Sequence, residues 1–228
     1  MFVGHLAAGL VLKARVREAP LSWLLWATVA PDLLCGVLVI LGVEQVVVEG
    51  TLVFGHLRSD IGYSHALSAS IACALIAGAV AARASRSRRV GAALGLALLS
   101  HFVLDALTHR HDMPLLGFDA SHDLRLGTNL ALHPWGMFAL ELLGCLYAWW
   151  VFDRKNRRLL GTLATLLVLY TNSLFGFWAL PTPSVATLGG AMFASFVVAT
   201  LVVLWAGRAS AAVLPARRPR GVGAQTAA

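Results

Sequence analysis

Residues 185–207, VATLGGAMFASFVVATLVVLWAG, form an apolar stretch without a charged side chain. A helix needs about 20 such residues to cross a hydrocarbon core roughly 30 Å thick. Five more stretches meet the same criterion: 21–48, 64–82, 90–108, 134–152 and 158–180. The sequence therefore predicts an all-α fold, a polytopic membrane helical bundle with about six transmembrane helices.

The two ends of the chain differ from these spans. The segment from Phe2 to Leu12 is apolar but has about half the length needed to cross a membrane, so we expect a short N-terminal interfacial or re-entrant helix. Residues 215–228 contain mostly Pro, Gly, Arg and Ala without periodicity, which predicts a disordered C-terminal tail. Residues 1–214 are expected to form a single membrane domain.

The composition agrees with a protein whose main solvent is lipid. Hydrophobic residues make up 58% of the chain and charged residues 13%, with a mean hydropathy of +0.76, whereas soluble domains contain roughly 25% charged residues. The three cysteines lie in apolar runs without a CxxC spacing. Neither a disulfide framework nor a thiolate metal site is indicated.

The basic residues indicate topology rather than binding to nucleic acid. They lie in short clusters between apolar runs, as the positive-inside rule predicts for cytoplasmic loops. The clusters comprise Arg83, Arg86, Arg88 and Arg89; Arg154, Lys155, Arg157 and Arg158; and Arg208, Arg217, Arg218 and Arg220. The connections 49–63, 109–133 and 181–184 contain few basic residues. We therefore expect a multi-pass membrane protein with both termini in the cytoplasm and no nucleic-acid partner.

Four polar side chains lie inside otherwise apolar spans: Asp32, His101, Asp105 and Glu141. A carboxylate near the middle of a membrane helix costs roughly 2.5–3.5 kcal/mol, so three unpaired carboxylates would cost on the order of 9 kcal/mol. A neighbouring histidine, a water-filled cavity or a cation must compensate for this cost.

The run SHFVLDALTHRH at 100–111 is the most informative of these sites. His101 and Asp105 are four residues apart, so they share one face of a helix. A nitrogen and an oxygen ligand on one face suit zinc or a similar first-row metal. The alternative is a structural hydrogen bond between the two side chains.

Three more short elements contain polar residues in the first part of the chain: Gly4-His5, Ala30-Pro31-Asp32 and Tyr63-Ser64-His65. Pro31 can break its helix and direct Asp32 into the bundle. The alternative for Asp32 is a structural, helix-breaking acid. His65 follows Ser64, which is a good helix N-cap, so the alternative for His65 is an interfacial side chain.

Together, four motifs resemble a known family: GHLAAGL at 4–10, APDLL at 30–34, YSHALS at 63–68 and SHFVLDALTHRHDMPLL at 100–116. The chain resembles the YdjM-like family of LexA-regulated inner-membrane proteins, described as metal-dependent hydrolases. The resemblance implies a divalent metal, zinc first, and as its ligands or their supports His5, Asp32, His65, His101 and Asp105.

The chain departs from the family's pattern in two motifs. Family members often have Pro-Asp-x-Asp-His where this chain has Pro31-Asp32-Leu33-Leu34-Cys35, and a longer His-containing element before His65. A single-metal site, or one without catalysis, therefore stays open. More distantly, the spacing of His101, Asp105 and His111 is similar to that of zinc-dependent phospholipase C and related nucleases, which adds His111 as a ligand candidate and favours phosphoester chemistry.

The connection 109–133 and the span after it offer further candidates. The connection is long and rich in histidine and acids, which suits a lid or substrate mouth; for His122 and Asp123 a solvated connection is preferred. Glu141 lies inside a span and is expected to act as a general base or an additional ligand, with Asp32 as the second catalytic candidate.

Two classes of function fit these residues. The first is a membrane-embedded metal-dependent hydrolase acting on a phosphoester or lipid-linked substrate near the outer membrane face. The alternative is a non-enzymatic membrane protein for ion or proton transport or haem binding. In both cases His5 starts on the opposite face from His65, so either the first helix re-enters the bundle or the first span is broken at Pro31.

Overall fold

The computed structural model describes residues 1–117, 123–178 and 183–213, and the predicted tail at 215–228 lies outside them. The described part contains these α-helices: α1 (Val3–Arg15), α2 (Leu21–Ile40), α3 (Leu67–Ser85), α4 (Arg88–Ala106), α5 (Pro134–Asp153), α6 (Arg157–Phe175) and α7 (Val185–Val213). All of these except α1 are long and apolar enough to cross a membrane. The prediction of an all-α, multi-pass membrane bundle is confirmed.

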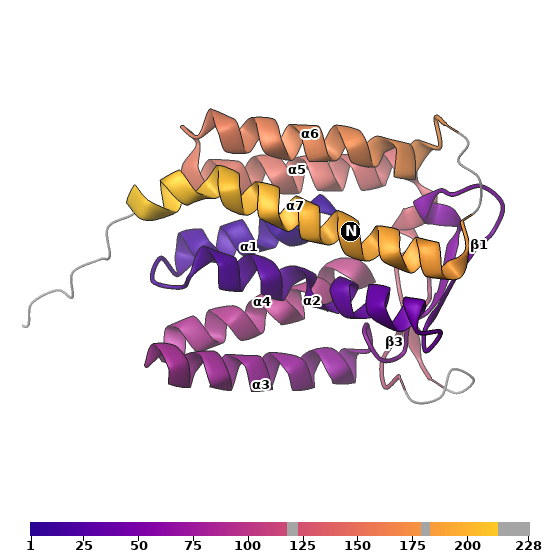
Figure 1. Cartoon of the computed structure of the whole chain (residues 1–228), viewed down its shortest axis with the longest axis horizontal. Coiled ribbons are helices and arrows are strands. Elements are labelled where there is room, and N and C mark those ends of the chain that lie inside the picture. Colours follow the sequence, from indigo (N-terminus) through magenta and orange to yellow (C-terminus); the bar gives the residue numbers. More distant parts are fainter. Residues whose placement is uncertain (118–122, 179–182, 214–228) are drawn as a thin grey trace, which may run out of the picture.

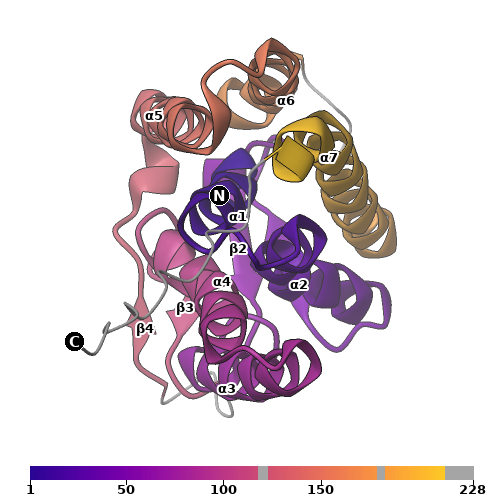
Figure 2. The ribbon, with the colours of Figure 1, turned by 90° about the vertical axis from the view of Figure 1, so that its left-hand side faces the viewer.

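The helices lie roughly parallel to one another, with α5 and α6 along one side and α3 and α4 along the other (Figure 1). Seen end-on, α1 lies in the interior, surrounded by the longer helices (Figure 2). Val3, Leu6 and Leu10 are completely buried and pack in a core with residues of α2, α5, α6 and α7. The structure packs the first helix inside the bundle, where an apolar helix of 13 residues can bury most of its surface.

Small residues bring α3 and α4 into close contact. A Cβ atom added at Gly95 would lie 2.9 Å from the carbonyl oxygen of Ala74, and one added at Gly78 would lie 3.0 Å from that of Gly91. The spacing of Gly91 and Gly95 is that of small residues at membrane helix interfaces, where packing rather than hydrophobic burial drives association. This hairpin sets the position of His101 on α4 relative to His65, which directly precedes α3.

The first span is shorter than predicted. The prediction of a helix over 21–48 is wrong at its end, because α2 stops at Ile40 and Gly42 adopts a positive φ of 71°. Residues 45–48 form β1 (Gln45–Val48), which pairs antiparallel with β2 (Leu57–Asp60), and the short helix η1 (Phe54–His56) lies between them. The alternation of exposed and buried residues in β1 is typical of a half-buried strand. Of the two alternatives for bringing His5 to the site, a break at Pro31 is not found, since α2 continues through it.

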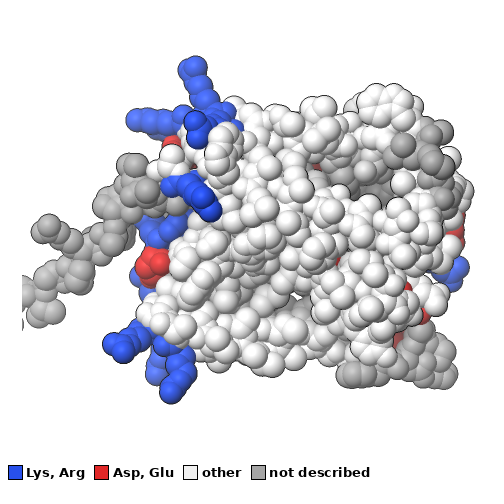
Figure 3. Space-filling view, in the orientation of Figure 1, with Lys and Arg blue, Asp and Glu red and all other residues white. Residues whose placement is uncertain are grey.

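The remaining connections lie at the same end of the bundle as the β1–β2 hairpin. β3 (Met113–Pro114) pairs with β4 (Arg125–Leu126), and η2 (Leu130–Leu132) leads into α5. Lys and Arg gather instead at the opposite end, where the α3–α4 and α5–α6 turns lie (Figure 3). The molecule therefore has one strongly basic end and one end made of hairpins and loops.

Candidate metal centre

Five polar side chains from four separate segments meet in the interior of the bundle. His5 comes from α1, Asp32 from α2, His65 from the turn before α3, and His101 and Asp105 from α4. All five residues are buried. Two overlapping groups, His5 with His101 and Asp105, and Asp32 with His65 and His101, each bring their ligand atoms within 4.8 Å of one another and could hold a metal ion.

The ring orientation of His101 is set by the backbone of α2. Its Nδ1 lies 2.7 Å from the carbonyl oxygen of Thr28. A carbonyl oxygen only accepts hydrogen bonds, so Nδ1 carries a proton, and in the neutral imidazole Nε2 presents the lone pair. Thr28 lies one turn before Asp32 on α2, so the same helix supplies both the carbonyl that orients His101 and a carboxylate of the cluster.

The ring of His65 is oriented by a second chain of hydrogen bonds. Ser64 Oγ donates to Glu44 Oε2 at 2.6 Å, while the backbone N–H groups of Tyr63 and Ser64 donate to Glu44 Oε1. Because the hydroxyl proton of Ser64 is used in this way, His65 Nδ1, at 2.7 Å from Ser64 Oγ, must donate to it. In the neutral ring, Nε2 of His65 is then also the nitrogen with the lone pair.

The two Nε2 atoms face each other, with Nε2 of His65 and Nε2 of His101 only 3.1 Å apart. Two lone pairs at this distance repel each other unless a cation or a proton lies between them. Histidine ligands of metals typically have their other nitrogen held by a carbonyl, a carboxylate or a hydrogen-bonded chain ending in one. Both rings meet this description.

Carboxylate oxygens complete the group at similar distances. Asp105 Oδ2 lies 3.0 Å from His101 Nε2 and 3.6 Å from His65 Nε2, and the two oxygens of Asp32 lie 3.5 Å from His65 Nε2 and 3.8 Å from His101 Nε2. Around a tetrahedral zinc ion with bonds of about 2.0–2.2 Å, neighbouring ligand atoms are roughly 3.3–3.6 Å apart. The spacings among His65, His101 and Asp105 are close to this range, and Asp32 lies near both histidines.

His5 lies next to this group of four. Its Nε2 is 3.1 Å from Asp105 Oδ1, and its ring stacks on that of His101 with centroids 3.9 Å apart. Within the described residues, and apart from this approach of Nε2 to Asp105, neither ring nitrogen of His5 makes a hydrogen bond, and neither does Asp32 Oδ2. Buried polar atoms without partners are rare, and a cation held between them would satisfy these.

Glu141 is placed differently from the expectation of a base or ligand. It is completely buried, and its two oxygens accept the backbone N–H groups of Phe2 and Gly4, both at 2.6 Å. These N–H groups belong to the start of α1, where a helix has no backbone partners of its own. Glu141 therefore anchors the first turn of α1, and through it His5. Next to it, the amino group of Met1 lies 2.7 Å from Asp105 Oδ1.

The structure does not bring His111 into the cluster. His111 is exposed, and its backbone N–H donates to Asn129 Oδ1. The helical spacing from His101 fails here because α4 ends at Ala106. His109, one turn after Asp105, lies closer, with its Nε2 3.8 Å from Asp105 Oδ1 and its Nδ1 3.3 Å from Asp112 Oδ1.

The loop residues expected at a lid or substrate mouth are only partly described. Asp119 and His122 lie outside the described residues. Asp123 accepts hydrogen bonds from the backbone N–H groups of Gly117 and Leu116, which lower the pKa of its carboxyl group. Asp123 thus has a local structural role in closing this loop.

Two residues of the site were not identified from the sequence. Glu44 lies within the predicted span 21–48 and was not singled out there, although an acid in an apolar run is the signal that identified Asp32 and Asp105. Thr28 acts through its backbone carbonyl, which leaves no signal in the sequence.

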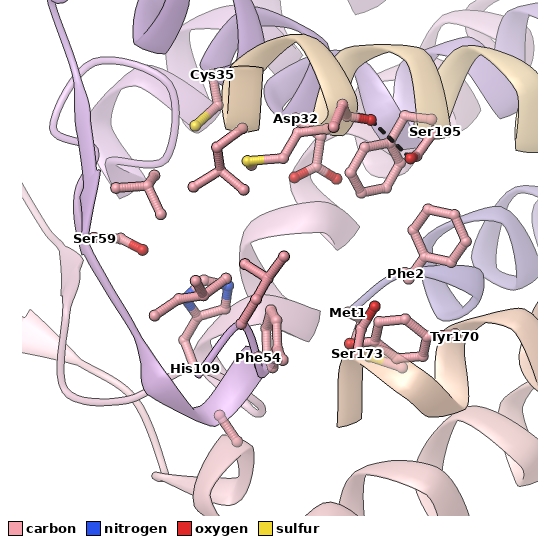
Figure 4. Close-up of a pocket in the computed structure, with 18 of the residues that line it drawn as sticks. Met1, Phe2, Asp32, Cys35, Phe54, Ser59, His109, Tyr170, Ser173 and Ser195 are labelled. Carbon is pink, nitrogen blue, oxygen red and sulfur yellow. Dashed lines mark hydrogen bonds between the residues drawn. The ribbon is translucent and has the colours of Figure 1, made fainter. Parts of the chain in front are cut away.

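A cavity of about 590 Å³ lies directly beside the cluster. Asp32, His65 and His109 line one part of it, and α6, α7 and the β1–β2 hairpin supply most of the rest. Figure 4 shows Asp32 and His109 on opposite walls, with Phe2 and Tyr170 farther along. The candidate ligands are thus reached from a largely apolar chamber.

No family model matches this chain. No curated protein and no solved structure matches it either. The resemblance to the YdjM-like family is therefore an expectation from four motifs, and function must be inferred from the cluster and its cavity.

Proposed function

We propose that this protein is a membrane-embedded hydrolase that uses a divalent metal ion, most naturally zinc, to cleave a phosphoester or lipid-linked substrate. One observation carries the proposal: the Nε2 atoms of His65 and His101 and the carboxylates of Asp32 and Asp105 converge beside a cavity. The YdjM-like motifs favour the same activity.

The residues divide into distinct roles in this proposal. His65, His101, Asp32 and Asp105 supply a mixed nitrogen and oxygen set, which suits zinc better than magnesium or calcium. Such an ion would lower the pKa of a bound water toward about 7 and polarise a phosphoester oxygen. His5 is positioned as a further ligand or as a hydrogen-bond partner of Asp105.

Asp32 is the proton acceptor that the geometry favours. No described residue donates a hydrogen bond to its Oδ2, and its side chain lines the cavity. A general base must reach the proton it removes, and a carboxylate oxygen that is already bonded to backbone N–H groups is a poor candidate. This argument favours Asp32 over Glu141.

The basic end of the molecule gives the proposed orientation. By the positive-inside rule, the α3–α4 and α5–α6 turns lie in the cytoplasm and the hairpins lie at the outer face of the inner membrane. The cluster lies nearer the hairpins, because His65 precedes α3 and Asp105 is close to the end of α4. The proposed substrate therefore reacts near the outer face.

Metal content tests the proposal directly. Purified wild type should contain close to one equivalent of zinc or manganese by mass spectrometry, and the His101→Ala/Asp105→Ala double variant should contain none. His65→Gln, a milder change, should also lose most of the metal. His111→Ala is the matched control and should keep it, since His111 is exposed outside the cluster.

The readouts also separate the proposal from its alternatives. Metal in the wild type together with hydrolysis of a phosphoester substrate, both lost in His65→Gln, would support a metal-dependent hydrolase. Absence of metal from folded wild type would contradict it, and a Soret band or proton flux in vesicles would then favour the non-enzymatic alternative.

A further inference from the structure

The cavity beside the cluster has a polar end and an apolar body. Its polar end is formed by Asp32, His65 and His109, whereas Leu166, Leu188 and Phe196 are among the apolar side chains of its body. Ser195 also lines it, but its hydroxyl donates to the carbonyl oxygen of Ala191 at 2.7 Å and so does not make this wall polar. A volume of about 590 Å³ is in the range of pockets that hold small organic ligands.

The cavity reaches the surface of the bundle between α6 and α7. Leu169, Ala191, Ala194 and Val198 line it and are also exposed. These two helices lie at the perimeter of the bundle, and the surface is hollowed beside α7 (Figures 2 and 3). Both helices are of membrane-spanning length and apolarity, so the opening faces hydrocarbon rather than water.

Tyr170 contributes a buried hydroxyl group that lacks a partner. Its side chain lines the cavity and stacks on Phe2, with ring centroids 5.4 Å apart. Tyr170 is only 8% exposed, and its hydroxyl makes no hydrogen bond within the described structure. A buried tyrosine hydroxyl usually finds a partner. An oxygen atom of a ligand in the cavity would provide one.

We propose that this cavity binds the hydrocarbon chain of a membrane lipid, which enters sideways between α6 and α7. The Tyr170 hydroxyl donates a hydrogen bond to an oxygen at the head of that lipid, and the head group is thereby directed toward Asp32 and His65. The idea that the lipid is then cleaved rests on the proposed function, whereas lipid binding does not depend on the metal. A chain is the fitting occupant because lipid is the medium at the opening and the body of the cavity is apolar.

A photoactivatable lipid tests the binding site. The probe is phosphatidic acid with a diazirine in one acyl chain, present at low fraction in phosphatidylcholine nanodiscs that contain the full-length protein. After irradiation, labelled residues of α6 and α7 are mapped by mass spectrometry. We expect labels on Ala191, Ala194 or Leu166, and competition by unlabelled phosphatidic acid.

Two variants and a matched control make this test specific. Ala194→Trp should fill the cavity and reduce labelling there at least tenfold, while Ala164→Trp, an identical change at an exposed position of α6 that does not line the cavity, should leave it unchanged. Tyr170→Phe removes only the hydroxyl. The concentration of unlabelled phosphatidic acid needed to halve the labelling should rise about fivefold, which corresponds to the loss of one hydrogen bond.

The outcomes distinguish this inference from the proposed function. Labelling of the cavity that survives in the His101→Ala/Asp105→Ala variant but falls in Ala194→Trp supports the lipid site even if the protein proves not to be a hydrolase. Labelling that is unchanged in both Ala194→Trp and Tyr170→Phe overturns the lipid site even if zinc and hydrolysis are found.

Discussion

His65 shows how much a single side chain depends on partners outside the cluster. Its Nε2 faces the other ligand atoms only because Ser64 accepts the proton of Nδ1 and is itself held by Glu44. Glu44 is almost completely buried, and its four-part network spans the end of α2 and the start of α3. The network fixes the ring before any metal binds, which reduces the entropy cost of binding.

Replacing Ser64 with alanine should therefore weaken metal binding without removing a ligand. The hydroxyl between His65 and Glu44 is lost, and we expect metal affinity to fall about 10–100-fold, the usual effect of removing an outer-shell partner. Titration with zinc against a competing chelator measures this change.

Ser100→Ala is the matched control for this prediction. Ser100 adjoins His101, but its hydroxyl donates to the carbonyl oxygen of Ala97 within α4. The zinc affinity of the Ser100→Ala variant should equal that of the wild type. Equal affinities for Ser64→Ala and wild type would mean that the network does not orient His65.

Among the elements, α1 has the most unusual position. It is too short to cross a membrane, yet it is buried and contributes His5 to the cluster. At its start, Glu141 of α5 accepts hydrogen bonds from the backbone N–H groups of Phe2 and Gly4. The carboxylate also complements the positive end of the helix dipole.

Changing Glu141 to glutamine should loosen this anchor. An amide has one acceptor oxygen and one NH₂ group, so either Phe2 or Gly4 loses its partner and meets a donor instead. We expect a loss of about 1–3 kcal/mol in the free energy of unfolding, the cost of an unsatisfied buried group. Thermal or denaturant unfolding in detergent measures it.

The control for the Glu141 variant is Glu18→Gln. Glu18 is largely exposed and forms a surface ion pair with Arg89 at 3.8 Å, and such pairs contribute little to stability. A Glu141→Gln protein as stable as the Glu18→Gln protein would show that α1 is held by packing alone.

For the whole molecule, the distribution of charge predicts how the bundle lies in the membrane. The basic end contains the α3–α4 and α5–α6 turns, and the opposite end contains both hairpins. Basic residues in short loops favour the cytoplasmic side. The six spans then alternate so that the β1–β2 hairpin and the loop 109–133 face outward.

Reporter fusions test this orientation. A reporter that is active only in the cytoplasm should be active when joined after Lys155, in the α5–α6 turn, and inactive when joined within 109–133. A reporter that requires export should show the reverse. Cytoplasmic activity of a fusion within 109–133 would contradict the orientation and would place the metal cluster near the inner face.

The sequence by itself determined the number of spans, the candidate ligands and the uneven distribution of charge. These features are local: about 20 apolar residues suffice to predict a span, and an acid in such a run stands out alone. The sequence pattern nevertheless predicted that the first helix continues to residue 48, because Val46, Val47 and Val48 are as apolar in a strand as in a helix.

Only the tertiary structure decided which candidates meet. His5, Asp32, His65 and His101 are far apart in the chain, and their nitrogen and oxygen atoms come within about 4 Å because α1 lies inside the bundle and glycines hold α3 against α4. The same packing places Glu141 at the start of α1 and leaves His111 outside the cluster. The ligands of a metal site must be placed relative to one another to within a few tenths of an ångström. This placement is set by how whole helices pack rather than by the residues within any one helix.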